Sequence, residues 1–305
     1  MLSLIKQIPP PSSKFGWPWT KGSEPLPSVM PNGKPWPKIS IVTPSYNQGQ
    51  FLEETIRSVL LQNYPNIEYI IMDGGSTDNS VEIIKKYEPW LTYWVSEKDN
   101  GQADAIYRGF ERATEDIIAW INSDDFYLPG AISNAVRSLI NNSNSSLVVG
   151  SSYHLSPESK YVRKYYGFSQ SFDSLLLNGM HFCQPACFWK RDKFFALGGF
   201  NRNLRFCFDY DMFLRFRKDG QFAITLHPTA VFRWHEESKS STIADVAQKE
   251  NVYLRGSYGY PEGTDCSKII AECHRQIQRS SRLGRVSDLW FDPKWLFRRW
   301  IPYTP

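Results

Sequence analysis

The sequence lacks any long apolar run: no stretch of its 305 residues approaches the roughly 18 apolar residues of a membrane-spanning helix. The opening segment, residues 1–8, is too short and wrongly flanked to be a secretion signal. The five cysteines are an odd number without the paired spacing of a zinc site, which suggests reduced thiols. A net charge of +4 is too small to indicate a nucleic acid partner. We therefore expect a cytoplasmic protein that binds no nucleic acid.

Length and composition predict one large domain with appendages. Hydrophobic residues make up 41% of the chain, which is enough for an ordinary core. Residues 1–37 are rich in proline and tryptophan, so we expect an irregular arm that packs along the domain surface. We expect residues 38–240 to form the main domain, with 38–125 as its ligand-binding half and 126–240 as its second half. Residues 241–305 are expected to be a helical C-terminal extension.

The most informative feature is a pair of adjacent carboxylates after a buried strand. Residues 117–121 are apolar and predict a strand that runs directly toward Asp124 and Asp125. Carboxylates at the end of a buried strand are costly unless something binds them, and they are hard ligands suited to magnesium or manganese. The alternative is a solvated turn in which an aspartate caps the next helix.

Two earlier predicted strands, residues 38–43 and 67–72, also end in polar turns and are each followed by a helical pattern. Alternation of strands and helices with right-handed crossovers brings such turns to one edge of a parallel sheet. Open α/β sheets bind ligands at that edge. The sequence thus predicts an α/β fold with a ligand site at the carboxyl ends of its strands.

Eight short motifs in order resemble the family 2 glycosyltransferases of the GT-A fold. They are SIVTPSYN (40–47), DGGSTD (73–78), GQADAI (101–106), NSDD (122–125), QPA (184–186), LGGF (197–200), FDYD (208–211) and RWH (233–235). Each motif alone is weak, but the ordered set is specific. The resemblance implies a Rossmann-like, mostly parallel sheet flanked by helices. It also implies inverting transfer of a sugar from a nucleoside diphosphate sugar to an acceptor hydroxyl.

The resemblance also assigns roles to residues of this chain. Those expected to bind the nucleotide sugar are Thr43, Pro44, Tyr46, Asn47, Asp73, Gly101, Gln102, Asp104 and Asp124. Asp125 and His235 are expected to hold a divalent cation, Mn²⁺ or Mg²⁺. We expect Gln184, Asp211 and Arg215 near the acceptor or the transferred sugar, although a salt bridge with Asp211 is the alternative for Arg215.

Asp209 matches the catalytic aspartate of the family, and we expect it to be the general base. Asp211 competes for this role, but on a helix the two positions point about 200° apart, so one of them must serve another purpose. Phe208 stands where the family commonly has an acidic residue, and an apolar neighbour favours a raised carboxylate pKa. Asn122 stands where the family often has aspartate, which leaves fewer carboxylates for a metal.

For the donor we favour a UDP- or dTDP-sugar over a GDP-sugar, although the Asp73 carboxylate suits the N–H donors of guanine as well as those of uracil or thymine. We expect a saccharide or lipid-linked acceptor and a role in polysaccharide or glycoconjugate synthesis. One alternative is an inactive family member that binds sugars or a partner, which Asn122 and Phe208 favour. The other is a sugar-phosphate nucleotidyltransferase, which usually has a basic loop that residues 46–49 lack.

Two interpretations apply to the aromatic C-terminal stretch, residues 286–305. Trp295, Trp300 and Tyr303 lie beside Arg298 and Arg299, a combination typical of peripheral contact with a membrane surface. Contact of this stretch with a membrane-bound partner is a related interpretation. Packing of these rings on the main domain is the alternative that we favour.

Overall fold

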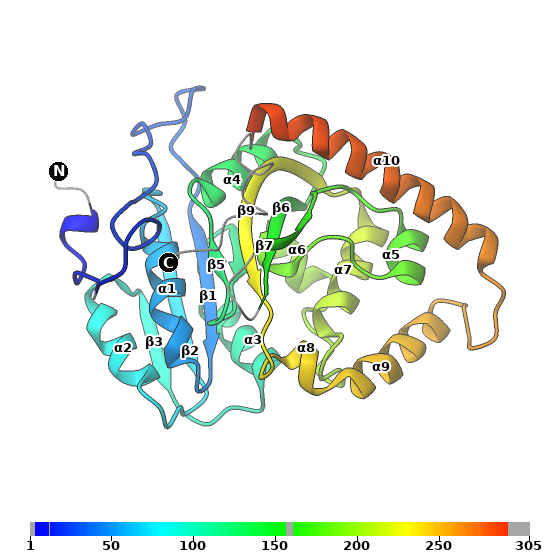
Figure 1. The fold of residues 1–305 in the computed structure, drawn as a ribbon, viewed down its shortest axis with the longest axis horizontal. Helices are drawn as coiled ribbons and strands as arrows, with labels where there is room; N and C mark the ends of the chain where they lie inside the picture. Colours follow the sequence, from blue (N-terminus) through cyan, green and yellow to red (C-terminus); the bar gives the residue numbers. More distant parts are fainter. Residues whose placement is uncertain (1–3, 12, 157–160, 292–305) are drawn as a thin grey trace.

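A single nine-stranded sheet organises the chain in the computed structural model, which describes residues 4–11, 13–156 and 161–291 (Figure 1). The strand order is β3-β2-β1-β4-β8-β6-β9-β5, with β7 added on β6. Helices cover both faces, so the predicted mixed α/β fold with a mostly parallel sheet is confirmed.

The first half alternates strand and helix, as the sequence predicts. Its elements are β1 (Ile39–Ser45), α1 (Gly49–Leu60), β2 (Ile67–Asp73), α2 (Ser80–Tyr87), a 3-10 turn (Glu88–Trp90), β3 (Tyr93–Ser96), α3 (Gln102–Arg112) and β4 (Ile117–Trp120). The four strands are parallel, and Ile39 pairs with Ile67 on one side and with Ile117 on the other. Every residue of β1 and β4 is buried, because helices cover both faces of a parallel sheet. The carboxyl ends of these strands therefore meet at one edge.

The second half extends the sheet with mixed directions. Its elements are β5 (Phe126–Tyr127), α4 (Ala131–Asn141), β6 (Leu147–Leu155), β7 (Tyr161–Tyr165), α5 (Phe172–Asn178), a 3-10 turn (Gln184–Ala186), β8 (Cys187–Lys190), α6 (Arg191–Ala196), α7 (Phe208–Asp219) and β9 (Ala223–Arg233). β8 runs antiparallel between β4 and β6, whereas β6 and β9 are parallel to each other. This order brings the end of β9 next to the turn that follows β4.

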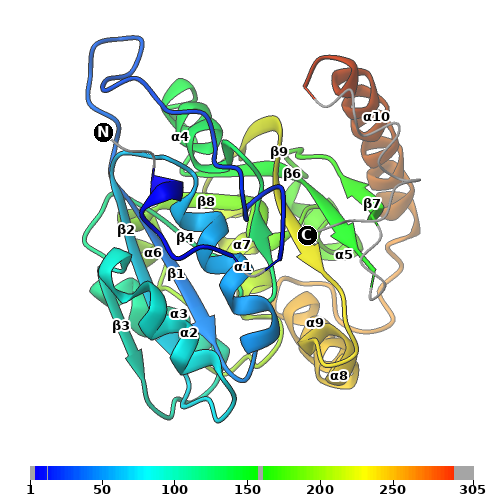
Figure 2. The ribbon, with the colours of Figure 1, turned by 60° about the vertical axis from the view of Figure 1, so that its left-hand side comes forward.

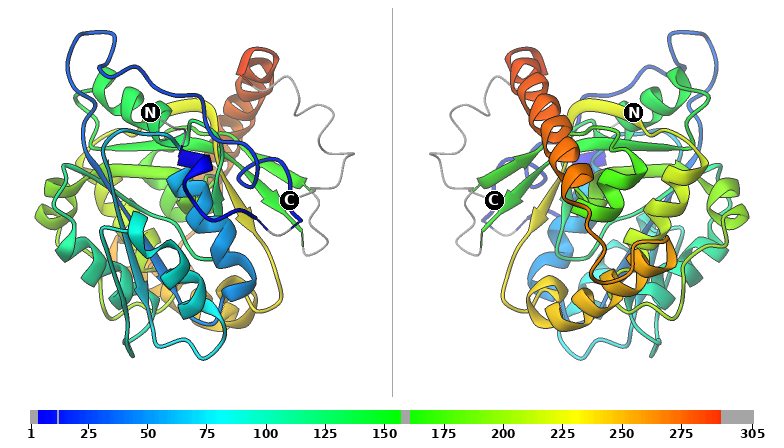
Figure 3. Two further views of the ribbon diagram at one scale, coloured as in Figure 1. Left: turned by 90° about the vertical axis from the view of Figure 1, so that its left-hand side faces the viewer. Right: turned by 90° about the vertical axis from the view of Figure 1, so that its right-hand side faces the viewer.

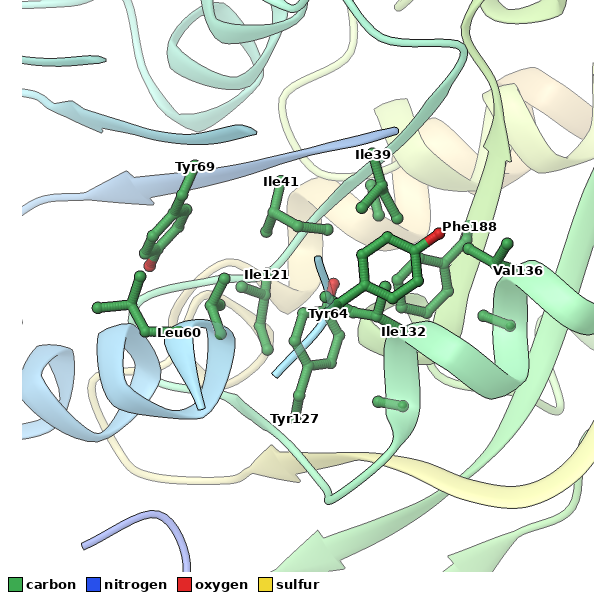
Figure 4. Packing of buried hydrophobic residues seen from close by; sticks show 14 of the residues in the cluster. Ile39, Ile41, Leu60, Tyr64, Tyr69, Ile121, Tyr127, Ile132, Val136 and Phe188 are labelled. Atoms are coloured by element: carbon green, nitrogen blue, oxygen red, sulfur yellow. The ribbon is translucent and has the colours of Figure 1, made fainter. Parts of the chain in front are cut away.

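Most of the core forms two apolar layers, one on each face of the sheet, and a smaller third cluster contains Tyr153 and Val231. One layer lies under α1, α2 and α4 and contains Ile41, Ile56, Ile132 and Tyr127; Figure 4 shows part of it. The other lies under α3, α5 and α7 and is dominated by aromatic rings, such as Phe110 and Trp189 in edge contact at 5.9 Å. These layers fix the strand ends in place.

Three helices follow β9: α8 (Lys239–Thr242), α9 (Ala244–Ser257) and α10 (Ser267–Phe291). α10 lies against α5 and β9 along the second half of the domain (Figure 3). Helices therefore continue after the sheet as far as residue 291. In residues 4–11, 13–156 and 161–291 no helix is both long and apolar enough to cross a membrane. The expectations for the aromatic C-terminal stretch rest on side chains that lie outside the described part of the chain.

The described residues of the N-terminal arm pack on the domain beside α1 (Figure 2). The Trp19 and Trp36 side chains are buried, and the Trp17 indole N–H donates to the Tyr127 carbonyl at 2.8 Å. Arg57 of α1 is fully buried and donates to the carbonyls of Pro9, Pro18 and Trp19 at 2.7–3.0 Å. A buried guanidinium therefore ties the arm to the first helix.

Candidate active site

Two adjoining cavities open where the strands end. The first, of about 590 Å³, is lined by the turns after β1, β2, β3 and β4, including Tyr46, Gly74 and Asp99, and we name it the strand-end cavity. The second, of about 360 Å³, is lined by Asp209 and by many aromatic residues, including Phe208 and Phe232, and we name it the aromatic cavity. Both are lined by Gln102, Asn122, Asp124, Ser238 and Lys239. A ligand in one cavity would therefore meet a ligand in the other beside Asp124.

Asp124 lies at this junction and contacts His235, which lines neither cavity. The Asp124 Oδ2 is 3.0 Å from the His235 Nε2, although the two residues are 111 positions apart in sequence. β9 ends two residues before His235, and the adjacent β5 begins two residues after Asp124, so the pairing of β5 with β9 holds the two side chains together. The His235 ring also packs against Phe51 of α1, at 5.1 Å between centroids.

Asp125 takes a different position from the one expected of a metal ligand. Its side chain is fully buried, and its Oδ1 accepts the backbone N–H of Arg233 at 2.9 Å. The Asn122 amide donates to its other oxygen at 3.3 Å. Burial, and then the charge of Asp124, raise the pKa of Asp125 well above its usual range. The structure thus turns Asp125 into the interior and leaves Asp124 at both cavities.

The donor set at the junction fits a divalent cation that is shared with a phosphate ligand. Within the described ranges no three His, Cys, Asp or Glu residues gather into a metal site. Asp124 offers a hard carboxylate oxygen and His235 an imidazole nitrogen. Magnesium is commonly held by one or two carboxylates together with substrate phosphates, so two protein ligands suffice. Asp124 and His235 thus form a donor set that fits the expected cation, whereas the Asp125 carboxylate, which was also expected to hold it, is buried in the interior.

Asp209 lines the aromatic cavity from the first turn of α7. Its Oδ1 accepts the backbone N–H of Tyr210 at 2.7 Å. Burial raises the pKa of Asp209 to about 6, even though this hydrogen bond and the Lys239 ammonium both favour the charged form. A carboxylate with a pKa near neutrality is suited to accept a proton from a hydroxyl group.

Asp211 and Arg215 are not at either cavity, contrary to the expectation that they contact acceptor or sugar. The Arg215 guanidinium donates to Asp211 Oδ2 at 2.8 and 3.0 Å. It also donates to the carbonyls of Leu197 and Gly199 at 2.5 and 2.6 Å. The helical period points the Asp211 side chain away from that of Asp209. The alternative given for Arg215, a salt bridge with Asp211, is the arrangement in the structure. Their role in the structure is to hold the LGGF turn against α7.

The residues expected to bind the nucleotide divide into two groups. Pro44, Tyr46, Gly101, Gln102 and Asp124 line the strand-end cavity. The other four residues do not line it but support its walls through hydrogen bonds. The pairs are Thr43 with Tyr69, Asn47 with Thr77, Asp73 with Ser96 and Asp104 with Asn100. Asp73 also accepts the backbone N–H of Ser76 at 2.9 Å, which fixes the DGGSTD turn.

Gln184 lies in the aromatic cavity with an unused hydrogen-bond acceptor. Its Nε2 donates to the Trp120 carbonyl at 3.0 Å, whereas its buried Oε1 has no partner. A buried amide oxygen is costly when unsatisfied, so a ligand hydroxyl is a suitable partner. Gln184 thus offers one free acceptor to this cavity.

Sequence reasoning missed the aromatic wall of this cavity and the lysine at the junction. The rings of Tyr165, His154 and Phe232 lie in tilted contact across β7, β6 and β9, with neighbouring centroids 4.5 and 4.8 Å apart. These residues are far apart in sequence, and only the register that pairs His154 with Phe232 brings them together. Lys239, in contrast, follows the RWH motif closely and is the kind of residue that inspection of that motif could have found.

Comparison with solved structures shows that the architecture is the GT-A fold of glycosyltransferases. A complex of Staphylococcus aureus TarS 1–349 with UDP-GlcNAc superposes with a TM-score of 0.60 at 15% identity, over 77% of this chain and 71% of TarS. The Pyrobaculum calidifontis mannosyltransferase PcManGT, in complex with GDP-Man and Mn²⁺, gives 0.54 at 16% identity, over 83% and 75%. At these identities the likeness establishes the fold alone.

Sequence comparison gives the family. The model for "Glycosyl transferase family 2" matches residues 40–198, about half of the chain, so the protein belongs to that family. An uncharacterized glycosyltransferase of Rickettsia typhi is 27% identical over 232 residues, which is 72% of this chain and 67% of the relative. One from Mycobacterium tuberculosis is 38% identical over 105 residues, 34% of this chain and 40% of the relative. The chain thus spans less than half of that mycobacterial relative.

Proposed function

We propose that this family 2 glycosyltransferase moves a sugar from a nucleoside diphosphate sugar to an acceptor hydroxyl, with inversion at the anomeric carbon. The observation that carries the proposal is the junction of two cavities, with Asp124 at the junction and Asp209 on the aromatic side. The strand-end cavity receives the nucleotide, where Tyr46 covers a face of the base. The aromatic cavity receives the acceptor.

Asp209 is the general base of this proposal. The acceptor oxygen attacks the anomeric carbon while Asp209 accepts its proton, and the nucleoside diphosphate leaves with the electron pair of the broken C–O bond. A divalent cation held by Asp124 and His235 would neutralise charge on the leaving diphosphate. Gln184 orients a hydroxyl through its unpaired Oε1.

The chemistry of the aromatic cavity supports an uncharged, hydroxyl-bearing acceptor. The charged side chains that line it are Asp124, Asp209 and Lys239. Burial lowers the pKa of His154 to about 4, so its ring is neutral at physiological pH. An apolar wall with a few polar groups is typical of sites that bind the faces and hydroxyls of a sugar ring. A saccharide, free or lipid-linked, is therefore the proposed acceptor, and polysaccharide or glycoconjugate synthesis is the proposed role.

A thermal-shift screen tests the donor half of the proposal. UDP-, dTDP- and GDP-sugars would each be added with and without Mn²⁺, since a ligand of the native state raises its melting temperature. The neighbours bind UDP-GlcNAc and GDP-Man, so the screen must include both bases. Donor hydrolysis is then measured for the nucleotide sugars that bind. Binding without hydrolysis or transfer would favour the inactive alternative, and no shift with any nucleotide sugar would refute the proposal.

A further inference from the structure

Lys239 begins α8 and lines both the strand-end and the aromatic cavity. Its ammonium donates one hydrogen bond, to Gln102 Oε1 at 3.1 Å, and faces the Phe208 ring at 5.0 Å. Among the residues that the structure describes it has no ion-pair partner. The side chain is half-buried, and burial lowers its pKa. A charge that is partly removed from water, with one neutral partner, calls for an anionic ligand.

The surroundings of Lys239 indicate which anion fits. Gln102, its hydrogen-bond partner, is the first residue of the 11-residue helix α3. The N-terminus of that helix has no side-chain cap and lines the strand-end cavity through Gly101 and Gln102. Helix N-termini attract phosphate groups, so a second, independent feature favours an anion at the same place.

We propose that Lys239 binds the diphosphate of the donor and stabilises the nucleoside diphosphate as it leaves. This inference rests on the proposed function and adds a residue to it. The charged groups around Lys239 are Asp209, Glu250 and Arg205. Neither carboxylate is paired with it: Asp209 accepts from Tyr210, and Glu250 accepts the backbone N–H groups of residues 205–207. The ammonium is thus left for a ligand.

Calorimetry without metal separates the contribution of Lys239 from that of a cation. UDP and uridine would be titrated, in EDTA, into the wild type and into Lys239→Met, and GDP and guanosine would be tested in parallel. We expect Lys239→Met to weaken binding of the diphosphate on the order of tenfold, the usual effect of losing a charge-assisted hydrogen bond, and to leave the nucleoside unchanged. Lys239→Arg should retain part of the diphosphate affinity.

Lys249→Met is the matched control, because Lys249 is an exposed lysine of α9 that lines neither cavity. It should bind all four compounds as the wild type does. Equal weakening of nucleoside and nucleoside diphosphate in Lys239→Met would indicate a merely structural role and overturn the inference, as would an unchanged diphosphate affinity. If the wild type binds neither UDP nor GDP in EDTA, the inference about Lys239 fails. The proposed function itself fails only if neither compound binds when Mn²⁺ is added either.

Discussion

At the residue scale, the two aspartates of the FDYD motif serve different purposes. Asp209 opens to the aromatic cavity, and Asp211 is neutralised by Arg215. The helical period alone predicts that only one of them can face a substrate. The hydrogen bonds of Arg215 to two carbonyls of the LGGF turn explain why Asp211 is the structural one.

We predict that Asp209→Asn folds and binds donor but transfers sugar at least about 100-fold more slowly, because the amide cannot accept the proton. In the wild type, kcat/KM should fall as the pH drops through about 6, where Asp209 becomes protonated. Asp211→Asn is the control, and it should retain that pH profile while losing thermal stability. A slower chemical step in Asp211→Asn than in Asp209→Asn, with both proteins folded, would move the base to Asp211.

The same carboxyl links stability to pH. The folded-state pKa of Asp209 is raised from 3.8 to about 6, so its stabilising contribution is present in full below about pH 4 and is lost as pH rises through 6. We therefore predict that Asp209→Asn melts at a higher temperature than the wild type above pH 6, with the difference shrinking toward pH 4. Melting curves at several pH values measure this, and a difference independent of pH would contradict it.

The acidic pair after β4 gives a second test at the residue scale. Asp124→Asn should lose Mn²⁺-dependent binding of a nucleoside diphosphate while it stays folded, because this side chain is at the junction beside His235. Asp125→Asn should keep that binding, because an amide oxygen can still accept the Arg233 N–H. Calorimetry with and without Mn²⁺ compares the two variants. If Asp125→Asn lost Mn²⁺-dependent binding while Asp124→Asn kept it, Asp125 would be the metal ligand.

At the element scale, the strand ends and the helices between them could be predicted from local sequence. Hydrophobic runs and β-branched residues predict β1, β2 and β4. The polar turns after these strands predict a ligand site where the strand-end cavity lies. The direction of the Asp125 side chain could not be predicted, since it depends on the Arg233 N–H, 108 residues away. The aromatic cavity likewise depends on the register of β6 with β9, which no local pattern encodes.

The attachment of the N-terminal arm to α1 is also a property of elements. Arg57→Met should release the arm, because three carbonyls, two of them buried, lose a charged donor. It should lower the free energy of unfolding by at least about 2 kcal/mol. Thermal melting and limited proteolysis within residues 4–37 measure this. Lys193→Met, the control, removes a partly exposed ion pair with Asp219 that lies outside the Arg57 network, and it should cost about 1 kcal/mol or less. Equal effects of the two substitutions would argue against the arm contact.

At the scale of the whole molecule, the two halves of the sheet divide the work. The turns after β1 to β4 build the strand-end cavity, and β6, β7 and β9 build the aromatic wall. One continuous sheet holds both, with β8 between β4 and β6. The relative position of the two cavities is therefore fixed by the core and not by loops alone. Donor and acceptor binding should consequently be separable by mutation in different halves.

We predict that one substitution in each half of the sheet weakens the binding of a different substrate. Phe232→Ala should raise the KM of an alkyl glycoside acceptor on the order of tenfold, because one ring of the aromatic wall is lost, while the Kd of the donor stays within about twofold. Tyr46→Ala should weaken the donor and leave the acceptor KM nearly unchanged, because Tyr46 lines only the strand-end cavity. Initial rates with each substrate varied in turn, together with donor calorimetry, measure both effects. If Phe232→Ala weakened the donor as strongly as the acceptor, the aromatic cavity would have to be reassigned to the donor sugar.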